Sequence, residues 1–196
     1  MLEVGRKKLE GRSEEGRAGK CVLLAAVLFA LFVVMPRAMA QGPAPLWDTG
    51  TFSILGYDPD TGEVGAAVQL RVFSVGNGVL WADAAAGIAA TQAIVDVGYG
   101  PQALDLRGRR VAPDAIIKRI LDQDPDPLPE NWSKQGRQFA VMNLNGEYAA
   151  YTGPKATEWA GNKGGKFCTA QGNILAGPAV VDNMVANFEK TKGHLS

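Results

Sequence analysis

The feature that most constrains the fold is a predicted β-hairpin over residues 51–69, TFSILGYDPDTGEVGAAVQ. After Thr51, the residues Phe52, Ile54 and Gly56 alternate with Ser53, Leu55 and Tyr57, which is the two-residue period of a strand. The DPDTG segment supplies the turn, because Pro59 presets φ at the second turn position and Gly62 can adopt a positive φ. A fold that opens with a tight hairpin builds an antiparallel sheet.

The following segments predict further strands and two amphipathic helices. Residues 78–95 are rich in alanine and glycine, which favours closely packed strands, with an alanine-rich helix as the alternative. Asn145-Gly146 marks the tip of a second hairpin. The expected order is a hairpin (51–69), small-residue strands (78–95), a helix (112–124), a hairpin (138–153), a strand (165–177) and a helix opened by Gly177-Pro178.

This order predicts an α+β fold, because strands arrive in antiparallel pairs with helices after them. A doubly wound parallel sheet would instead alternate single strands with helices. Two stretches are expected to be loops: DPDPLPEN (124–131), where three prolines disfavour helix, and KGGK (163–166).

Residues 1–40 have the layout of a secretory signal: a basic leader, a 15-residue apolar run (21–35) and a small-residue AMA ending at Ala40. The apolar run is short for a transmembrane span of roughly 20 residues. We therefore expect cleavage after Ala40 and export to the periplasm or outside the cell, with an uncleaved membrane anchor as the alternative. Residues 41–50 are interpreted as a linker and residues 51–196 as the folded domain.

Charge narrows the range of partners. The chain has 20 basic and 20 acidic residues, and residues 41–196 retain 13 basic and 16 acidic ones. A mildly acidic chain without a Lys/Arg cluster argues against nucleic acid or an anionic membrane as a partner. Membrane contact is expected only through an uncleaved signal, and homo-oligomerisation is left open.

Histidine and cysteine offer little chemistry. The single histidine, His194, lies near the C-terminus, which argues against a histidine-dependent triad or metal site. Cys168 is the only cysteine after the signal, so a Cys-x-x-Cys zinc site is excluded. Its strand-like context indicates a small buried hydrophobe. We expect no metal and no cofactor.

Two acidic pairs, Asp58 with Asp60 and Asp124 with Asp126, lie in proline-bearing turns. Acidic side chains commonly form such turns, so these carboxylates are interpreted as solvated turn formers rather than as catalytic pairs. Tyr99 is expected to pack with its hydroxyl at the surface.

One nucleophile needs no histidine. A threonine that becomes the first residue of a mature chain can use its own α-amine as the base that activates its hydroxyl. Thr51 follows Gly50 and opens the first predicted strand, so it meets the sequence requirement. The alternative is that Thr51 is an ordinary strand-starting residue.

Several blocks of sequence resemble the family called domain of unknown function 1028, from Thr51 to about residue 189. They are TFSILGYDPDTGEVGAAVQ, FSVGNGVLWADAAAGIAATQA, YGPQAL, RQFAVMNLNGEYAAYTG, WAG and AQGNILAGPAVVDNM. The resemblance implies a fold related to N-terminal-nucleophile hydrolases: two antiparallel sheets between helical layers (αββα), with the nucleophile, here Thr51, opening the first strand.

The resemblance also suggests supporting residues and departures. Asn173 is expected to bind an oxyanion or orient a substrate, with Gln92 and Thr91 as further polar candidates. Alternatively, these side chains satisfy buried backbone groups. Leu70 stands where many relatives carry serine, and the chain is expected to be a C-terminally truncated copy.

The resulting hypothesis is an exported hydrolase of an amide or peptide bond in a small molecule or peptide. Signal cleavage exposes Gln41, so a second cut before Thr51 would be needed. The alternative is a catalytically inactive binding domain of the cell envelope with the same fold.

Overall fold

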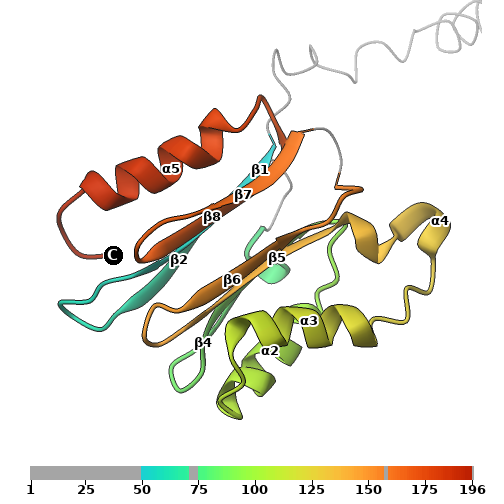
Figure 1. Cartoon of the computed structure of the whole chain (residues 1–196), viewed down its shortest axis with the longest axis horizontal. Coiled ribbons are helices and arrows are strands. Elements are labelled where there is room, and N and C mark those ends of the chain that lie inside the picture. The colour runs from blue at the N-terminus through green and yellow to red at the C-terminus, as the bar shows by residue number, and fades with distance from the viewer. Residues whose placement is uncertain (1–49, 71–74, 157–158, 196) are drawn as a thin grey trace, which may run out of the picture. The chain divides into compact units, whose positions relative to one another are not determined.

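The computed structural model describes residues 50–70, 75–156 and 159–195 (Figure 1). The signal expected over residues 1–40 and linker residues 41–49 lie outside this part of the chain. Within the described residues, no helix has both the length and the apolar character needed to cross a bilayer.

The first sheet contains the predicted opening hairpin. Strands β1 (Thr51–Tyr57) and β2 (Val64–Gln69) pair antiparallel around a turn in which Gly62 adopts a φ of 76°. On its other side β1 pairs with β8 (Cys168–Leu175), which pairs with β7 (Trp159–Gly164). The strand order is β2-β1-β8-β7, so the beginning and the end of the domain share the centre of one sheet (Figure 1).

The second sheet has the order β3-β4-β5-β6, and all its strands pair antiparallel. Strands β3 (Leu80–Asp83) and β4 (Gly87–Ala93) occupy the small-residue segment, which confirms strands there rather than an alanine-rich helix. Strands β5 (Arg137–Asn143) and β6 (Tyr148–Thr152) form the second predicted hairpin, with Gly146 at a φ of 79°.

Helices cover the outer faces of the two stacked sheets, which confirms the α+β layered fold (Figure 1). Helices α2 (Tyr99–Gly108) and α3 (Pro113–Gln123) pack on the second sheet, and α5 (Ala179–Lys190) packs on the first. A short helix α4 (Pro129–Trp132) and two 3₁₀ turns, Val75–Asn77 and Lys134–Gly136, complete the described elements.

Three elements differ from the sequence expectations. Helix α2 was not predicted, because two of its four buried residues, Gly100 and Ala103, are small and weaken the apolar pattern of Tyr99 and Leu106. Gly100 packs on Trp81, where a Cβ would lie 2.3 Å from the indole. Helix α4 begins at Pro129 inside the expected DPDPLPEN loop, because proline is tolerated in the first turn of a helix. Residues 163 and 164 of the expected KGGK loop belong to β7, where pairing with β8 outweighs their weak strand propensity.

A buried ionic cluster ties the helical layer to the second sheet. The Tyr99 hydroxyl donates to the Asp124 carboxylate, and the Arg137 Nε lies 3.5 Å from the same carboxylate oxygen. The side chains of Asp124 and Arg137 are only 1% and 8% exposed. The expectations of a surface Tyr99 hydroxyl and a solvated Asp124 are therefore wrong, since the folded chain brings Arg137 of β5 against both groups.

This environment shifts the pKa of both Tyr99 and Asp124. Burial, followed by the hydrogen bond to Asp124, raises the pKa of Tyr99, so the phenol remains a donor. Burial alone would raise the pKa of Asp124. The hydrogen bond from Tyr99, the backbone N–H of Asp126 at 2.7 Å and the Arg137 guanidinium outweigh it, and the pKa of Asp124 lies below its ordinary value.

We expect Asp124→Asn to lower the free energy of unfolding at pH 7 by about 3 kcal/mol, because the buried Arg137 would lose its nearer carboxylate and keep only Asp96, at 4.0 Å, as an ionic partner. The folded-state pKa of Asp124 is below the unfolded value of about 3.9. Its stabilisation is therefore complete above that value and is lost as the pH falls through the folded-state pKa. Urea unfolding at pH 7 and at pH 3 should show that the difference in the free energy of unfolding between wild type and variant is smaller at pH 3.

The matched control is Asp122→Asn, which removes a carboxylate that pairs with Lys118 on the exposed face of the same helix. Exposed pairs contribute at most about 1 kcal/mol, so this variant should unfold almost like wild type. Similar losses for both variants, or a loss at position 124 that does not change with pH, would contradict the assignment.

Candidate active site

The layer between the two sheets is apolar at one end and polar at the other. Alternate residues of a strand face the same side, so the inward side chains of β1 and β8 face those of β4 and β5 across the layer between the sheets. The apolar half contains Leu55, Ile88, Ala90, Ala140 and Met142, with Thr169, which pairs with Leu55, as a buried polar exception. The polar half contains six buried side chains, Thr51, Ser53, Gln92, Gln138, Gln171 and Asn173.

Ser53 and Gln171 connect the first sheet to β4. The Ser53 hydroxyl donates to Gln92 Oε1 at 2.7 Å and accepts from Gln171 Nε2 at 3.3 Å. Gln171 Nε2 also lies 3.1 Å from the carbonyl oxygen of Ala90. Among the described residues, Gln171 Oε1 has no hydrogen-bond partner although it is buried. Apart from this oxygen, the hydrogen bonds of Ser53 and Gln171 join the first sheet to β4 of the second.

Gln92 is the centre of the polar half. Its Nε2 donates to Gln138 Oε1 at 2.8 Å and lies 3.5 Å from both the Thr51 carbonyl oxygen and Asn173 Oδ1. Gln138 in turn donates to the Gly172 carbonyl oxygen at 2.9 Å. Because Asn173 directs its oxygen toward Gln92, its amide nitrogen is directed away from Gln92 and can act as a donor to a bound group.

Thr51 lies at the edge of this polar half. It is the first residue of β1, pairs with Asn173 across the β1–β8 ladder and is 6% exposed. Gly50 packs so closely on β8 that a Cβ there would lie 2.4 Å and 2.2 Å from the carbonyl oxygens of Asn173 and Ile174. The Gly50–Thr51 peptide bond is therefore held beside Asn173.

Two residues beside the site adopt the left-handed backbone conformation. Ala93, directly after Gln92, has a φ of 66°, and Ile174, directly after Asn173, has a φ of 55°. A β-branched residue rarely adopts positive φ. Each such conformation costs about 1–3 kcal/mol, and such residues cluster at functional sites. Ala93 is the last residue of β4, and Ile174 precedes the last residue of β8, opposite an irregularity in the pairing of β7.

The structure brings three of the four sequence candidates together. Thr51, Gln92 and Asn173 meet in the polar half, whereas Thr91 faces the opposite side of β4. The Thr91 hydroxyl donates to the Gly78 carbonyl oxygen at 2.7 Å and accepts from Trp81 Nε1 at 3.3 Å. Thr91 therefore satisfies local groups and is not part of this site.

Three members of the polar half were missed from the sequence: Ser53, Gln138 and Gln171. A signal was present, since each is a polar residue within a predicted strand and shares its face with a candidate two positions away or on the paired strand. The sequence could not show that both sheets direct these residues into one space.

Cys168 is fully buried, as predicted. It belongs to the apolar cluster between β8 and α5, not to the layer between the sheets. Burial, with a further contribution from the charge of Glu189, raises the pKa of its thiol to about 11. The thiol is therefore protonated at neutral pH and is not a nucleophile there.

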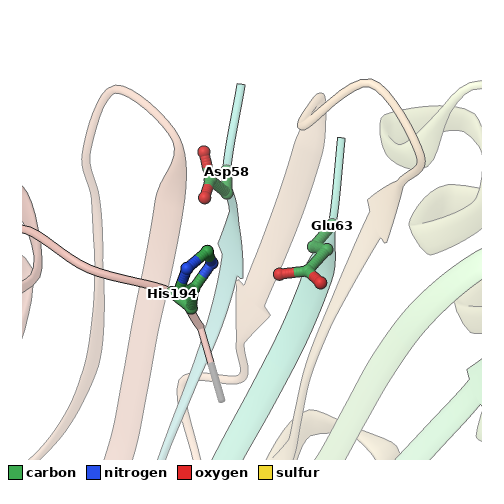
Figure 2. Close-up of side chains that lie close together, drawn as sticks. All are labelled: Asp58, Glu63 and His194. Atoms are coloured by element: carbon green, nitrogen blue, oxygen red, sulfur yellow. The ribbon is translucent and has the colours of Figure 1, made fainter. Parts of the chain in front are cut away.

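A second group of reactive side chains lies beyond the other end of β1. Ligand atoms of Asp58, Glu63 and His194 all lie within 4.8 Å of one another (Figure 2). The pKa of Asp58 is lowered, chiefly because its carboxylate accepts the backbone N–H of Asp60. The sequence argued against a metal site at His194, because its proximity to the hairpin turn cannot be predicted from its position in the chain.

A family model and a solved structure match the chain. The model of the family of unknown function (DUF1028) matches residues 51–196. The crystal structure of protein SPO2555 from Silicibacter pomeroyi, itself a DUF1028 protein, has a TM-score of 0.68 and 30% sequence identity, over 74% of this chain and 62% of that chain. The match thus spans less than two thirds of that relative's length. No curated protein matches the chain.

We expect Gly50→Ala to destabilise the uncleaved chain by about 2 kcal/mol, because the new methyl group would overlap two backbone carbonyl oxygens of β8. Urea unfolding of the intact chain measures this effect. Gly108→Ala is the control, since no atom lies within 4 Å of its Cβ position and alanine favours helix. If both variants kept wild-type stability, the close approach of Gly50 to β8 would be refuted.

We expect Gln92→Glu to destabilise the fold by about 2–3 kcal/mol at pH 8, because an ionised carboxylate would face the oxygens of Gln138 and Asn173. Burial should raise the pKa of this carboxyl above the unfolded value of about 4.3, so protonation should recover stability as the pH falls toward that value. Gln69→Glu on the exposed face of β2 is the control and should change stability little at either pH. A penalty that is the same at pH 5 and pH 8 would argue against this polar layer.

Proposed function

Because the chain belongs to the family of unknown function DUF1028, we propose its function from its own geometry: it is an exported hydrolase of amide or peptide bonds. Thr51 is the nucleophile, once residues 1–50 have been removed. The observation that carries this proposal is the position of Thr51 as the first residue of β1, buried beside Asn173. Stacked antiparallel sheets between helices, with a nucleophile opening the first strand, are the arrangement of N-terminal-nucleophile hydrolases.

Cleavage of the Gly50–Thr51 bond creates the base. In the uncleaved chain the nitrogen of Thr51 is an amide and cannot accept a proton. After cleavage it is an α-amine with an unperturbed pKa of about 7.7–8.0, which suits a general base near neutral pH. The same residue then carries both the base and the hydroxyl, so no imidazole is required.

The proposed reaction proceeds in two steps. The Thr51 Oγ1 attacks the substrate carbonyl while the α-amine takes its proton and passes it to the departing amine, which leaves an ester on Thr51. Water then attacks this ester with the amine again acting as base, and the acid product departs. Each turnover consumes one water and restores the threonine hydroxyl.

Asn173 and Gln92 have separate roles in this scheme. Asn173 Nδ2 donates to the negatively charged oxygen that develops in each step, which is the usual function of an amide in an oxyanion hole. Gln92 is a positioning residue, because its amide contacts Asn173 Oδ1 and thereby directs Asn173 Nδ2 toward the reacting carbonyl. The reaction requires no metal or organic cofactor.

Two cleavages precede activity in this proposal. The first, after Ala40, accompanies export to the periplasm or the medium and leaves Gln41 as the first residue. The second removes residues 41–50, either by attack of Thr51 on the neighbouring carbonyl or by another protease. Membrane contact is then limited to chains that retain the apolar run 21–35.

The test is intact-mass analysis of the protein exported by bacteria that express the full chain. We expect a mature species that begins at Thr51 and is labelled there by a β-lactone probe. Thr51→Ala should abolish labelling, and it should retain residues 41–50 if the second cut is autocatalytic. Thr51→Ser should restore both properties, whereas Thr61→Ala in the exposed hairpin turn should behave like wild type.

An exported chain that keeps residues 41–50 and resists labelling would refute the hydrolase. That outcome would favour the alternative of a catalytically inactive binding domain. The layered fold would be unaffected in either case.

A further inference from the structure

We propose that Asp58, Glu63 and His194 form a binding site for a divalent transition-metal ion that joins the C-terminal tail to the β1–β2 hairpin. This site is separate from the proposed active site. Asp58 follows the last residue of β1 and Thr51 is its first, so at about 3.3 Å per residue the two sites are more than about 20 Å apart. The proposal does not depend on the function of Thr51.

The hairpin holds the two carboxylates on opposite sides of its turn. The backbone N–H of Asp58 donates to the Glu63 carbonyl oxygen at 2.9 Å, and that of Gly62 donates to the Asp58 carbonyl oxygen at 2.8 Å. Asp58 Oδ1 accepts the Asp60 N–H at 2.8 Å, and Thr61 also hydrogen-bonds to this carboxylate, so a metal ion would bind a carboxylate that the turn already orients. No hydrogen bond from the described residues reaches the Glu63 carboxylate.

The C-terminal tail brings the imidazole to this turn. Helix α5 ends at Lys190, and the Thr191 hydroxyl caps it by donating to the Asn187 carbonyl oxygen at 2.8 Å. Gly193 has a φ of 139°, a conformation that favours glycine. Leu195 then lies against β2, within 3.4 Å of the Cβ position of Gly65. The tail is thus fixed on both sides of His194.

Three ligand groups, two carboxylates and one imidazole, converge from these segments. Figure 2 shows the imidazole of His194 beside both carboxylates, with Glu63 and Asp58 on different sides of the ring. Their ligand atoms lie within 4.8 Å of one another, yet no ion pair within 4.0 Å forms between His194 and either carboxylate. The three groups therefore surround a common point without bonding to each other.

The donor set suits zinc and similar ions. One imidazole nitrogen and two carboxylate oxygens bind Zn²⁺ at about 2.0–2.2 Å, which places ligand atoms about 3.3 Å apart in a tetrahedral site. The side chains of Glu63 and His194 are exposed, so they have room to move closer to a bound ion. Solvent can supply the fourth ligand, because the site lies at the surface.

Zinc titration of the untagged full chain, after removal of metals with a chelator, tests the site. We expect saturable binding of one zinc ion at this site and a rise in the melting temperature with zinc concentration. His194 is the only histidine in the chain, so its imidazole NMR signal reports directly on ligation. This signal should shift or broaden on zinc addition in wild type.

Loss of second-shell partners alone weakens metal sites by about 10–100-fold, so His194→Ala and Glu63→Gln should each weaken zinc binding by at least about tenfold. Asp60→Asn is the matched control, because it neutralises an exposed carboxylate in the same turn outside the cluster. It should bind zinc as wild type does. An unchanged imidazole signal on zinc addition, or equal zinc affinity in wild type and His194→Ala, would overturn the proposal. A site that is intact in a chain lacking hydrolase activity would uphold it independently.

Discussion

The structure depends on burying six polar side chains between two sheets, where each sheet must supply hydrogen-bond partners for the other. An unpaired amide or hydroxyl in such a layer costs several times what a made hydrogen bond contributes. Ser53 and Gln171 of the first sheet therefore require β4 of the second, and Gln138 of the second requires the backbone of β8. Apolar layers can slide past one another, whereas these hydrogen bonds form in one register of the two sheets, with Gln171 Oε1 the one side-chain atom of the six that is buried without a partner among the described residues.

The layer between the sheets has an apolar half, which stabilises the fold, and a polar half, which contains the candidate active site. Leu55, Ile88 and Met142 form the dry half and hold the sheets together by burial of apolar surface. The polar half begins where β1 begins, so its amides lie beside Thr51 and its backbone. The strained residues Ala93 and Ile174 lie at this end of β4 and β8. The backbone carbonyl oxygen of Thr51 lies 3.5 Å from Gln92 Nε2, and this position beside buried amides is why the hydrolase proposal rests on Thr51.

The helical layer on the second sheet is linked to the polar half of the inter-sheet layer through β5. Ala93 and Arg137 are paired residues of β4 and β5, next to the pair Gln92 and Gln138. Arg137 faces the helices and pairs with Asp124, while Gln138 faces the other sheet. Adjacent residues of β5 thus link the polar layer to α2 and α3. At the far end of β1, the hairpin turn and the tail after α5 meet around His194, so both ends of this strand carry groups capable of chemistry.

The sequence by itself determined the elements whose signal is local. The two hairpins, α3 and α5 follow from turn residues and from apolar periodicity within a few residues, and the α+β order follows from their succession. It also singled out Thr51, Gln92 and Asn173. Only the tertiary structure decided that these three meet, that Thr91 does not join them, and that Tyr99 and Asp124 are buried against Arg137. It likewise brought His194 to Asp58 and Glu63. Each of these facts joins residues far apart in the chain, and the alternation that reveals a strand does not reveal which other strand its inward face will meet.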